Sequence, residues 1–230
     1  GRSTARESWA TEIGREFGPD DTPEILLARL IGSHTKSLRE ATSAIDLEVM
    51  SEVSGRIARS RQVDVYGVGG SAMLAAELTG RLYRIGVSAF AWADAHLGLV
   101  SAAIQGPGTV AIGISTTGRT EETIEMLAEA GRAGAFTVAI TNNPGSPLDE
   151  LAEASIVTSV YEQALQPDDL SAKHGQLLVL DLLYLLVAQE DFDRSSDKLA
   201  ASALAVASHR RPRRPVGRGG TGPDHERAHA

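Results

Sequence analysis

The sequence contains no cysteine, which excludes disulfides, thiolate metal sites and a cysteine nucleophile. Aromatic residues make up only 4% of the chain, against 42% for all hydrophobic residues, so the core must consist mainly of Ala, Val, Ile and Leu. No apolar run approaches the roughly 20 residues that a membrane-spanning helix needs. We therefore expect a cytoplasmic protein with no membrane partner.

Charge and size set further limits. The net charge of -8 argues against a nucleic-acid surface on the body of the protein, because duplex binding needs clustered Lys and Arg. No pair of histidines has a spacing typical of a metal site, so we expect neither a metal nor another cofactor. A chain of 230 residues and 24.2 kDa is long enough for one α/β domain with extra helices.

The hydrophobic pattern changes along the chain from helical spacing to alternating strands and helices. Two leading helices are followed by strands separated by helices, which implies βαβ units and a parallel sheet with helices on both faces. The fold class expected is α/β, a three-layer α-β-α sandwich with a five-stranded parallel sheet and extra N-terminal helices. The strands are expected at 63–66, 87–92, 109–114, 136–140 and 155–158. The helices are expected at 23–44, 47–60, 71–85, 95–104, 120–133, 147–152 and 170–190, with one more after Asp193 that ends at about Ser208.

Two turns rich in glycine or hydroxyl groups occupy matching places, each directly after a strand and before a helix. The first is Gly67-Val68-Gly69-Gly70-Ser71, and the second is Ser115-Thr116-Thr117-Gly118-Arg119-Thr120. A helix N-terminus leaves amide groups unpaired and carries partial positive charge, so it stabilises an anion. Glycines let the backbone approach the ligand, and hydroxyls add donors for phosphate oxygens. The two turns together predict a phosphate-binding site.

Other interpretations of these turns remain open. Gly67, Gly69 and Ala72 fit a form of the dinucleotide fingerprint, and Asp94 near the end of the second strand could bind a ribose hydroxyl. The glycines could also serve only a tight turn, and Thr120 or Thr123 could be an ordinary helix cap. Capping needs one hydroxyl, however, whereas the second turn offers four.

The helix expected at 170–190 is apolar on almost every side, which is typical of a buried helix. We expect it to form a subunit interface in a homodimer or homotetramer; a central core helix is the alternative. The residues from 209 to 230 are basic, rich in Pro and Gly and without periodicity, so we expect a disordered tail.

The two turns also resemble the sugar isomerase (SIS) domain, whose hallmarks are a Gly-x-Gly-x-Ser turn and a Ser-x-Ser/Thr-Gly-x-Thr turn. Within that superfamily the chain is similar to the RpiR-type transcriptional regulators, in the two leading helices, in Gly-Val-Gly-Gly-Ser-Ala with Leu-Tyr-Arg-Ile-Gly, and in the stretch 93–102. The resemblance implies a flavodoxin-like, doubly wound SIS domain over residues 23–208. Residues 5–17 look like the closing helix of the N-terminal helix-turn-helix domain, so residues 1–22 are expected to be its remnant and linker.

The family's site implies a set of phosphosugar-binding residues in this chain. They are Gly69, Gly70, Ser71, Ser115, Thr116, Thr117, Gly118 and Thr120, with the amides of Gly70, Thr116 and Gly118 as additional donors. Arg119 could add a contact or point to solvent. Possible contacts at the sugar end are Glu77 and His174, and the candidates for a catalytic base are Glu77, Glu162 and His174.

The resemblance implies a sensor of a sugar phosphate and not an enzyme, with DNA bound only through the helix-turn-helix domain that this chain lacks. The alternative is a phosphosugar aldose–ketose isomerase, which needs a base to move a proton between C1 and C2.

Overall fold

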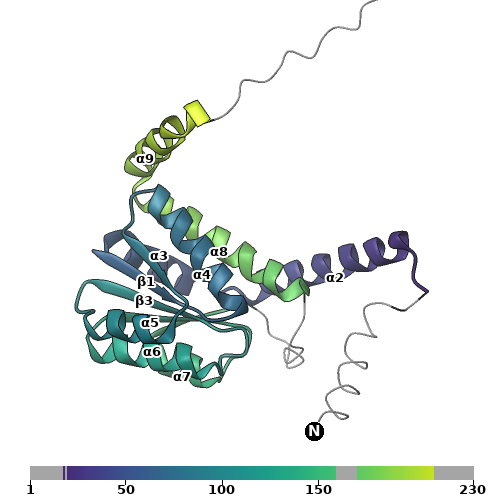
Figure 1. Cartoon of the computed structure of the whole chain (residues 1–230), viewed down its shortest axis with the longest axis horizontal. Coiled ribbons are helices and arrows are strands. Elements are labelled where there is room, and N and C mark those ends of the chain that lie inside the picture. Colours follow the sequence, from purple (N-terminus) through teal and green to yellow (C-terminus); the bar gives the residue numbers. More distant parts are fainter. Residues whose placement is uncertain (1–17, 19, 159–169, 210–230) are drawn as a thin grey trace, which may run out of the picture.

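A five-stranded parallel sheet forms the centre of the molecule, with the strand order β2-β1-β3-β4-β5 (Figure 1). The computed structural model describes residues 18, 20–158 and 170–209. The strands are β1 (Gln62–Tyr66), β2 (Ala89–Trp92), β3 (Thr109–Ile114), β4 (Phe136–Thr141) and β5 (Ala154–Val157). All neighbouring strands pair in parallel. This order is that of flavodoxin-like, doubly wound sheets and confirms the expected fold.

The helices agree with the sequence-based expectation to within a few residues. They are α2 (Pro23–Ala44), α3 (Leu47–Arg59), α4 (Gly70–Arg84), α5 (Ala95–Ala103), α6 (Glu121–Arg132), α7 (Pro147–Leu151), α8 (Leu170–Glu190) and α9 (Phe192–Ala205), followed by the short 3-10 helix η1 (Ala207–His209). The last helix was expected to end at about Ser208 and ends at Ala205, and β2 begins at Ala89 and not at residue 87. The amides of Gly86 and Val87 still donate to carbonyl groups of α4, and Gly86 has the positive φ of 86° typical of a helix end.

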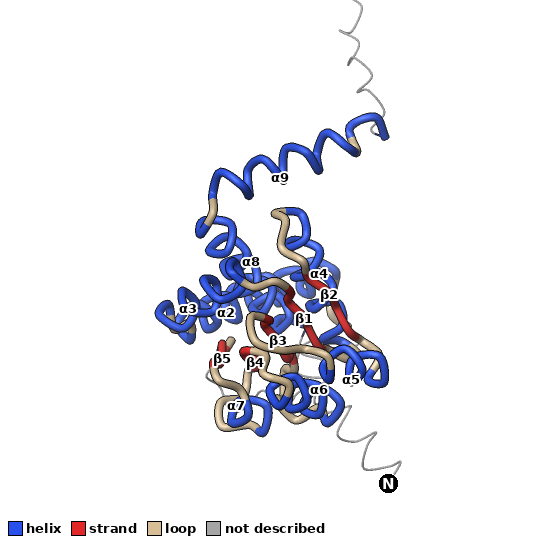
Figure 2. Tube along the Cα trace, turned by 90° about the vertical axis from the view of Figure 1, so that its left-hand side faces the viewer, coloured by secondary structure: helices blue, strands red, loops and turns tan. Residues whose placement is uncertain are grey.

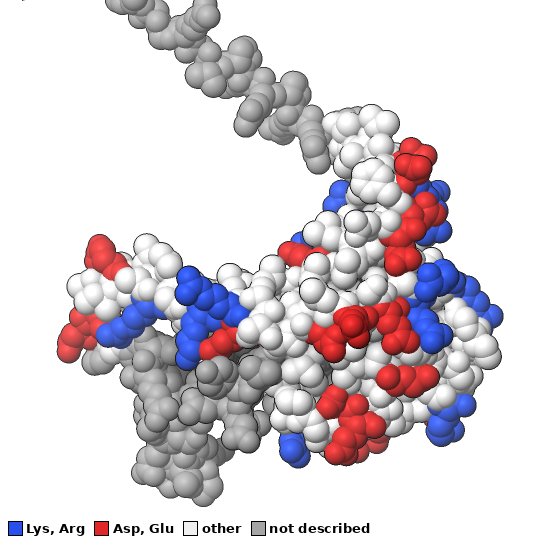
Figure 3. Space-filling view, turned by 180° about the vertical axis from the view of Figure 1, so that it is seen from behind, with Lys and Arg blue, Asp and Glu red and all other residues white. Residues whose placement is uncertain are grey.

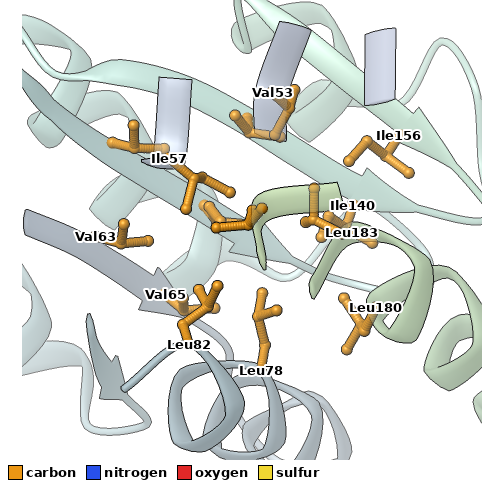
Figure 4. Close-up of a cluster of buried hydrophobic side chains, with 14 of the residues drawn as sticks. Val53, Ile57, Val63, Val65, Leu78, Leu82, Ile140, Ile156, Leu180 and Leu183 are labelled. Carbon is orange, nitrogen blue, oxygen red and sulfur yellow. The ribbon is translucent and has the colours of Figure 1, made fainter. Parts of the chain in front are cut away.

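Helices cover both faces of the sheet in three layers (Figures 1 and 2). Helices α3, α4 and α8 pack on one face, and α5, α6 and α7 on the other. Side chains of a strand alternate between faces, so Val63 and Val65 of β1 join the first core while Tyr66 joins the second. Figure 4 shows the first core, which consists of aliphatic side chains as the low aromatic content predicts.

The face under α6 and α7 carries small side chains. At Gly113 of β3, a Cβ would lie 3.1 Å from Leu148 Cδ1 and 3.2 Å from Leu127 Cδ2. These leucines belong to α7 and α6, so glycine at this position lets both helices approach the sheet closely. The N-terminus of α6 is thereby held against the end of β3.

A buried carboxylate fastens α5 to β1. The Asp64 side chain is fully buried and accepts hydrogen bonds from Gln62 Nε2 at 2.8 Å, Gln105 Nε2 at 2.7 Å and the Ser101 hydroxyl. Burial, with the neighbouring Asp64 carboxylate as the lesser cause, raises the pKa of Tyr66 above its usual range. The Tyr66 phenol therefore stays neutral at physiological pH, and the network serves to position the end of β1.

Helix α8 is a core helix of this chain, which supports the alternative to a subunit interface. It packs against α2, α3 and α4, and Val179, Leu180, Leu183 and Val187 are buried in the first core. The helix is apolar on nearly every side because other helices and the sheet of the same chain pack around it. Its clear exception is Leu185, which is 59% exposed.

Helices α2 and α9 extend from the body of the domain (Figure 1). Both carry large exposed apolar side chains: Ile25, Leu27, Leu30 and Ile31 on α2, and Phe192 and Leu204 on α9. None of the described helices is long and apolar enough to span a membrane. Of the expected disordered tail, 209–230, only His209 lies among the described residues; the expected helix at 5–17 lies wholly outside them.

Candidate functional site

The first turn connects β1 to α4 and is shaped by glycine. Gly67 is buried, its amide donates to Trp92 O at 3.1 Å, and a Cβ there would lie 3.0 Å from the carbonyl oxygen of Ser71. Gly69 has φ 56° and ψ -124°, a conformation that side chains rarely adopt. As the N-cap of α4 it offers no side-chain hydrogen bond, so the helix begins with amides that no cap side chain satisfies. Ser71 lies half-buried in the first turn of α4.

The second turn connects β3 to α6 and is shaped by hydroxyl groups. Ser115 is 1% exposed, and its Oγ lies 2.9 Å from Thr120 Oγ1. Thr120 is the N-cap of α6, yet its side chain makes no capping hydrogen bond, so its hydroxyl faces Ser115 and not the helix amides. Thr117 Oγ1 accepts from the amide of Arg119 at 3.3 Å, and Arg119 itself is exposed. Ordinary capping therefore does not account for this group of hydroxyls.

Gly118 allows the second turn to adopt a left-handed backbone conformation in close contact with α7. Its φ is 64°, and a Cβ would collide with Ser146 Oγ at the start of α7. Its amide donates to Ser115 O at 3.0 Å, so this amide is engaged within the turn. Of the three amides expected as phosphate donors, those of Gly70 and Thr116 are the better candidates.

The two turns lie at the same edge of the sheet, as the sequence predicts. Strands β1 and β3 are parallel neighbours, with Tyr66 paired to Gly113 in register. The helices that follow them cover opposite faces, α4 on one and α6 on the other. In doubly wound folds this reversal opens a crevice at the carboxyl ends of the strands, which is where ligands bind. The N-termini of α4 and α6 therefore both lie at the edge of the sheet where this fold binds its ligands.

Helix α8 brings two residues to this crevice that the sequence-based reasoning did not assign. A Cβ on Gly70 would lie 3.2 Å from Lys173 Nζ, which places a cation beside the first turn. Lys173 has no acidic partner in the part of the chain that the structure describes. Gln176 is fully buried, and its side-chain amide contacts Thr116 Oγ1 at 3.4 Å in the second turn. The segment Lys173-His174-Gly175-Gln176, directly before the apolar run 177–180, was the available signal.

The residues expected at the sugar end contact groups outside the two turns. The exposed Glu77 is paired with Arg81 at 2.6 Å, and Arg81 also approaches Asp181 of α8 at 3.2 Å. The hydrogen bond that Arg81 donates to the Glu77 carboxylate is the main cause that raises the pKa of Arg81. The exposed His174 lies with its ring centroid 4.3 Å from that of His34 on α2. Their contact with a ligand stays a prediction.

The remaining candidates have structural explanations or are not described. Asp94 is the N-cap of α5 and accepts from the amide of Leu97 at 2.8 Å, which accounts for an acid after β2 without a ribose. Glu162 lies outside the described residues. Within those residues there is no group of three or more side chains that could hold a metal ion.

Comparison with known proteins agrees with this geometry. A relative from Haemophilus influenzae, described as an uncharacterized HTH-type transcriptional regulator, is 32% identical over 178 residues, covering 77% of this chain and 62% of that protein. The HTH-type transcriptional regulator RpiR of Escherichia coli is 28% identical over 191 residues, covering 83% of this chain and 64% of RpiR. This chain thus spans less than two thirds of the length of either relative.

Among solved structures, the Vibrio vulnificus NanR protein complexed with ManNAc-6P has the same fold. Its TM-score is 0.74 at 26% sequence identity, over 79% of this chain and 69% of NanR. The family model of the SIS domain matches residues 56–186, which is more than half of the chain and includes both turns. From the fold, the two turns and this match we conclude that the chain belongs to the SIS domain family.

Proposed function

We propose that this chain is the effector-binding domain of a bacterial RpiR-type transcriptional regulator, and that it binds a sugar phosphate between the two turns. The observation that carries the proposal is the convergence of two helix N-termini, α4 and α6, at the switch point between β1 and β3. A dinucleotide's pyrophosphate needs one such terminus. A compact phosphate group can accept hydrogen bonds from both.

The phosphate would be held by hydroxyls of both turns and by one cation. Ser71 supplies the first turn, Ser115, Thr117 and Thr120 supply the second, and Lys173 adds a positive charge beside Gly70. Hydrogen bonds to a charged group are stronger than neutral ones. The NanR structure, which contains ManNAc-6P, supports a phosphorylated amino sugar or a related hexose phosphate as the ligand class.

A sensor fits the described residues better than an isomerase does. An isomerase needs a free base near C1 and C2 of the sugar. Of the candidates in the described chain, the carboxylate of Glu77 is engaged by Arg81, and the ring of His174 lies against His34. Incubation with hexose phosphates in heavy water tests this directly, since an isomerase would introduce deuterium at the exchanging carbon. Deuterium uptake would overturn the regulator assignment in favour of the isomerase.

DNA binding would belong to the helix-turn-helix domain that the relatives' names imply. Acidic side chains gather over the body of the domain on the face shown in Figure 3, which supports this division of roles. A ligand can regulate DNA binding only if it binds one arrangement of the regulator more tightly than the other. We place the regulator in the cytoplasm.

We also propose that the domain is a homodimer or homotetramer, held through the arms α2 and α9. The exposed apolar side chains there, including Leu27, Leu30 and Phe192, would be covered by a second copy. Light scattering should show an oligomer that Leu27→Glu dissociates. A monomeric parent chain would contradict this assignment and leave the ligand site unaffected.

Thermal unfolding with a ligand panel tests the binding site. Glucose 6-phosphate, fructose 6-phosphate and N-acetylmannosamine 6-phosphate are compared with the unphosphorylated sugars and with NAD. A ligand at 100 times its Kd adds about 2.7 kcal/mol of stability, which corresponds to roughly 5–10 °C for a domain of this size. We expect at least one sugar phosphate to stabilise the domain, and neither the unphosphorylated sugars nor NAD to do so. Stabilisation by NAD alone, or equally by unphosphorylated sugars, would contradict the proposal.

A further inference from the structure

Gln176 of α8 joins the second turn to the helix layer above it. Its side chain is fully buried. Nε2 donates to Asn142 Oδ1 at 2.9 Å and lies 3.4 Å from Thr116 Oγ1, and the Thr116 hydroxyl in turn lies 3.4 Å from Gln176 Oε1. A buried amide is stable only with such partners. Any displacement of the Thr116 side chain therefore acts on a group that belongs to α8.

The main chain of the second turn is anchored on its other side. The carbonyl oxygen of Thr116 accepts from the amide of Asn142 at 3.1 Å and from Thr141 Oγ1 at 3.3 Å. The Asn142 side chain also accepts from the Thr158 hydroxyl beyond the end of β5. The backbone of the turn is thus fixed to the sheet, and the Thr116 hydroxyl is the part that meets α8.

The same turn of α8 contacts α2 on its opposite side. A Cβ on Gly175 would lie 3.1 Å from Ser37 Oγ and 3.3 Å from Ala41 Cβ, so the two helices are in close contact there. The rings of His174 and His34 meet at 4.3 Å in an edge-to-face arrangement. A single helical turn, 173–176, therefore lies between the second turn of the site and α2.

We propose that Gln176 is the positioning residue that couples occupation of the phosphate site to helix α2. The inference rests on the proposed function, since it takes the second turn to be a phosphate site. A phosphate that accepts hydrogen bonds from the second turn reorients the Thr116 hydroxyl, and Gln176 must shift with it or lose a partner. Because packed helices move as rigid elements, the shift at 173–176 reaches α2 through the Gly175 and His174 contacts. Helix α2 is the described helix nearest the N-terminus, on the side where a DNA-binding domain would be attached.

Hydrogen exchange of the whole chain, with and without a sugar phosphate from the panel above, tests the coupling. In the parent chain we expect ligand to slow exchange in the peptide that covers 115–120 and to change exchange in α2. In Gln176→Leu the slowing at 115–120 should persist, with affinity reduced about fivefold or less, whereas the change in α2 should disappear. Gln189→Leu, at an exposed position of the same helix, should behave as the parent chain.

Substitutions at Thr116 test the contact from its other side and cover the case in which Gln176→Leu does not fold. Thr116→Ser keeps the hydroxyl and should preserve the response of α2, while the nearly isosteric Thr116→Val should abolish it. An unchanged response of α2 in both Gln176→Leu and Thr116→Val would overturn the coupling and leave the site intact. Absence of slowing at 115–120 in the parent chain would instead overturn the proposed function, and the coupling with it.

Discussion

The two turns of the candidate site serve one crevice but are built in different ways. The first turn relies on glycine: Gly69 and Gly70 are exposed, and a Cβ on Gly69 would meet nothing within 4 Å. The second turn is enclosed: Gly118 is buried against Ser146, and Ser115 donates its amide to Ile140 O of β4. The first is an open loop of main chain, and the second is a platform of hydroxyls fixed to the sheet.

This difference indicates that the two turns contribute to ligand binding in different ways. An open glycine turn can bring amides close to an anion and adjust to it, at an entropic cost on binding. A turn anchored through β4 and α8 presents the hydroxyls of Ser115 and Thr120 already paired with each other, so these two need little ordering when the ligand arrives. We therefore expect stability to depend mainly on the second turn, and substitutions there to weaken binding more.

Alanine substitutions at Gly69 and Gly118, the positive-φ glycines of the two turns, should show the largest difference in stability between the turns. Gly118→Ala adds backbone strain and a collision with Ser146 Oγ, so it should destabilise the domain by about 4 kcal/mol. Gly69→Ala adds strain without a collision and should lose about 2 kcal/mol. Urea denaturation measures both free energies of unfolding.

The control for these variants is Gly80→Ala in α4, where a Cβ meets nothing within 4 Å and no positive φ applies. Alanine favours a helix, so this change should stabilise the domain by about 0.5–1 kcal/mol. Equal losses at Gly69 and Gly118 would contradict the contrast between an open and an enclosed turn.

Removal of a hydroxyl from the second turn should weaken sugar-phosphate binding more than removal of a hydroxyl from the first turn. Ser115→Ala and Thr117→Ala should each weaken sugar-phosphate binding by about 1–2 kcal/mol, the scale of a hydrogen bond to a charged group. Ser71→Ala should lose about 1 kcal/mol or less, because amides of the first turn remain. Calorimetry measures the affinities, with Ser196→Ala on the exposed surface of α9 as the control. Undiminished affinity in the Ser115→Ala, Thr117→Ala double variant would discard the site.

Most of the fold was predictable because its signals are local. The alternation of strands and helices predicted the parallel sheet and the helices on both of its faces. Both turns were recognisable because each is a continuous segment between one strand and one helix. The expected subunit interface at α8 illustrates the limit: an apolar helix surface shows that something covers it, but not whether the cover comes from the same chain.

The contributions of α8 to the site were not predictable from spacing. Gln176 lies 60 residues from Thr116 along the chain, and Lys173 is more than 100 residues from Gly70. Only the packing of α8 against α2, α3 and α4 fixes where its first turns lie. Sequence patterns show which face of a helix is apolar, but they do not show against which loop its end will lie.

Lys173 provides one of the smallest expected effects and the sharpest test of how the open turn works. Its ammonium group lies beside Gly70, at a helix N-terminus that itself carries partial positive charge. Two positive groups side by side are stabilised by an anion between them, so Lys173→Met should weaken sugar-phosphate binding by about 1 kcal/mol. The exposed charge is screened by salt, and the difference between Lys173→Met and the parent chain should therefore shrink as salt is raised. Lys198→Met on α9 keeps its stem against Gly86 and serves as the control. A difference that does not change with salt would show that Lys173 acts through packing, and the open turn would then bind phosphate through its amides and Ser71 alone.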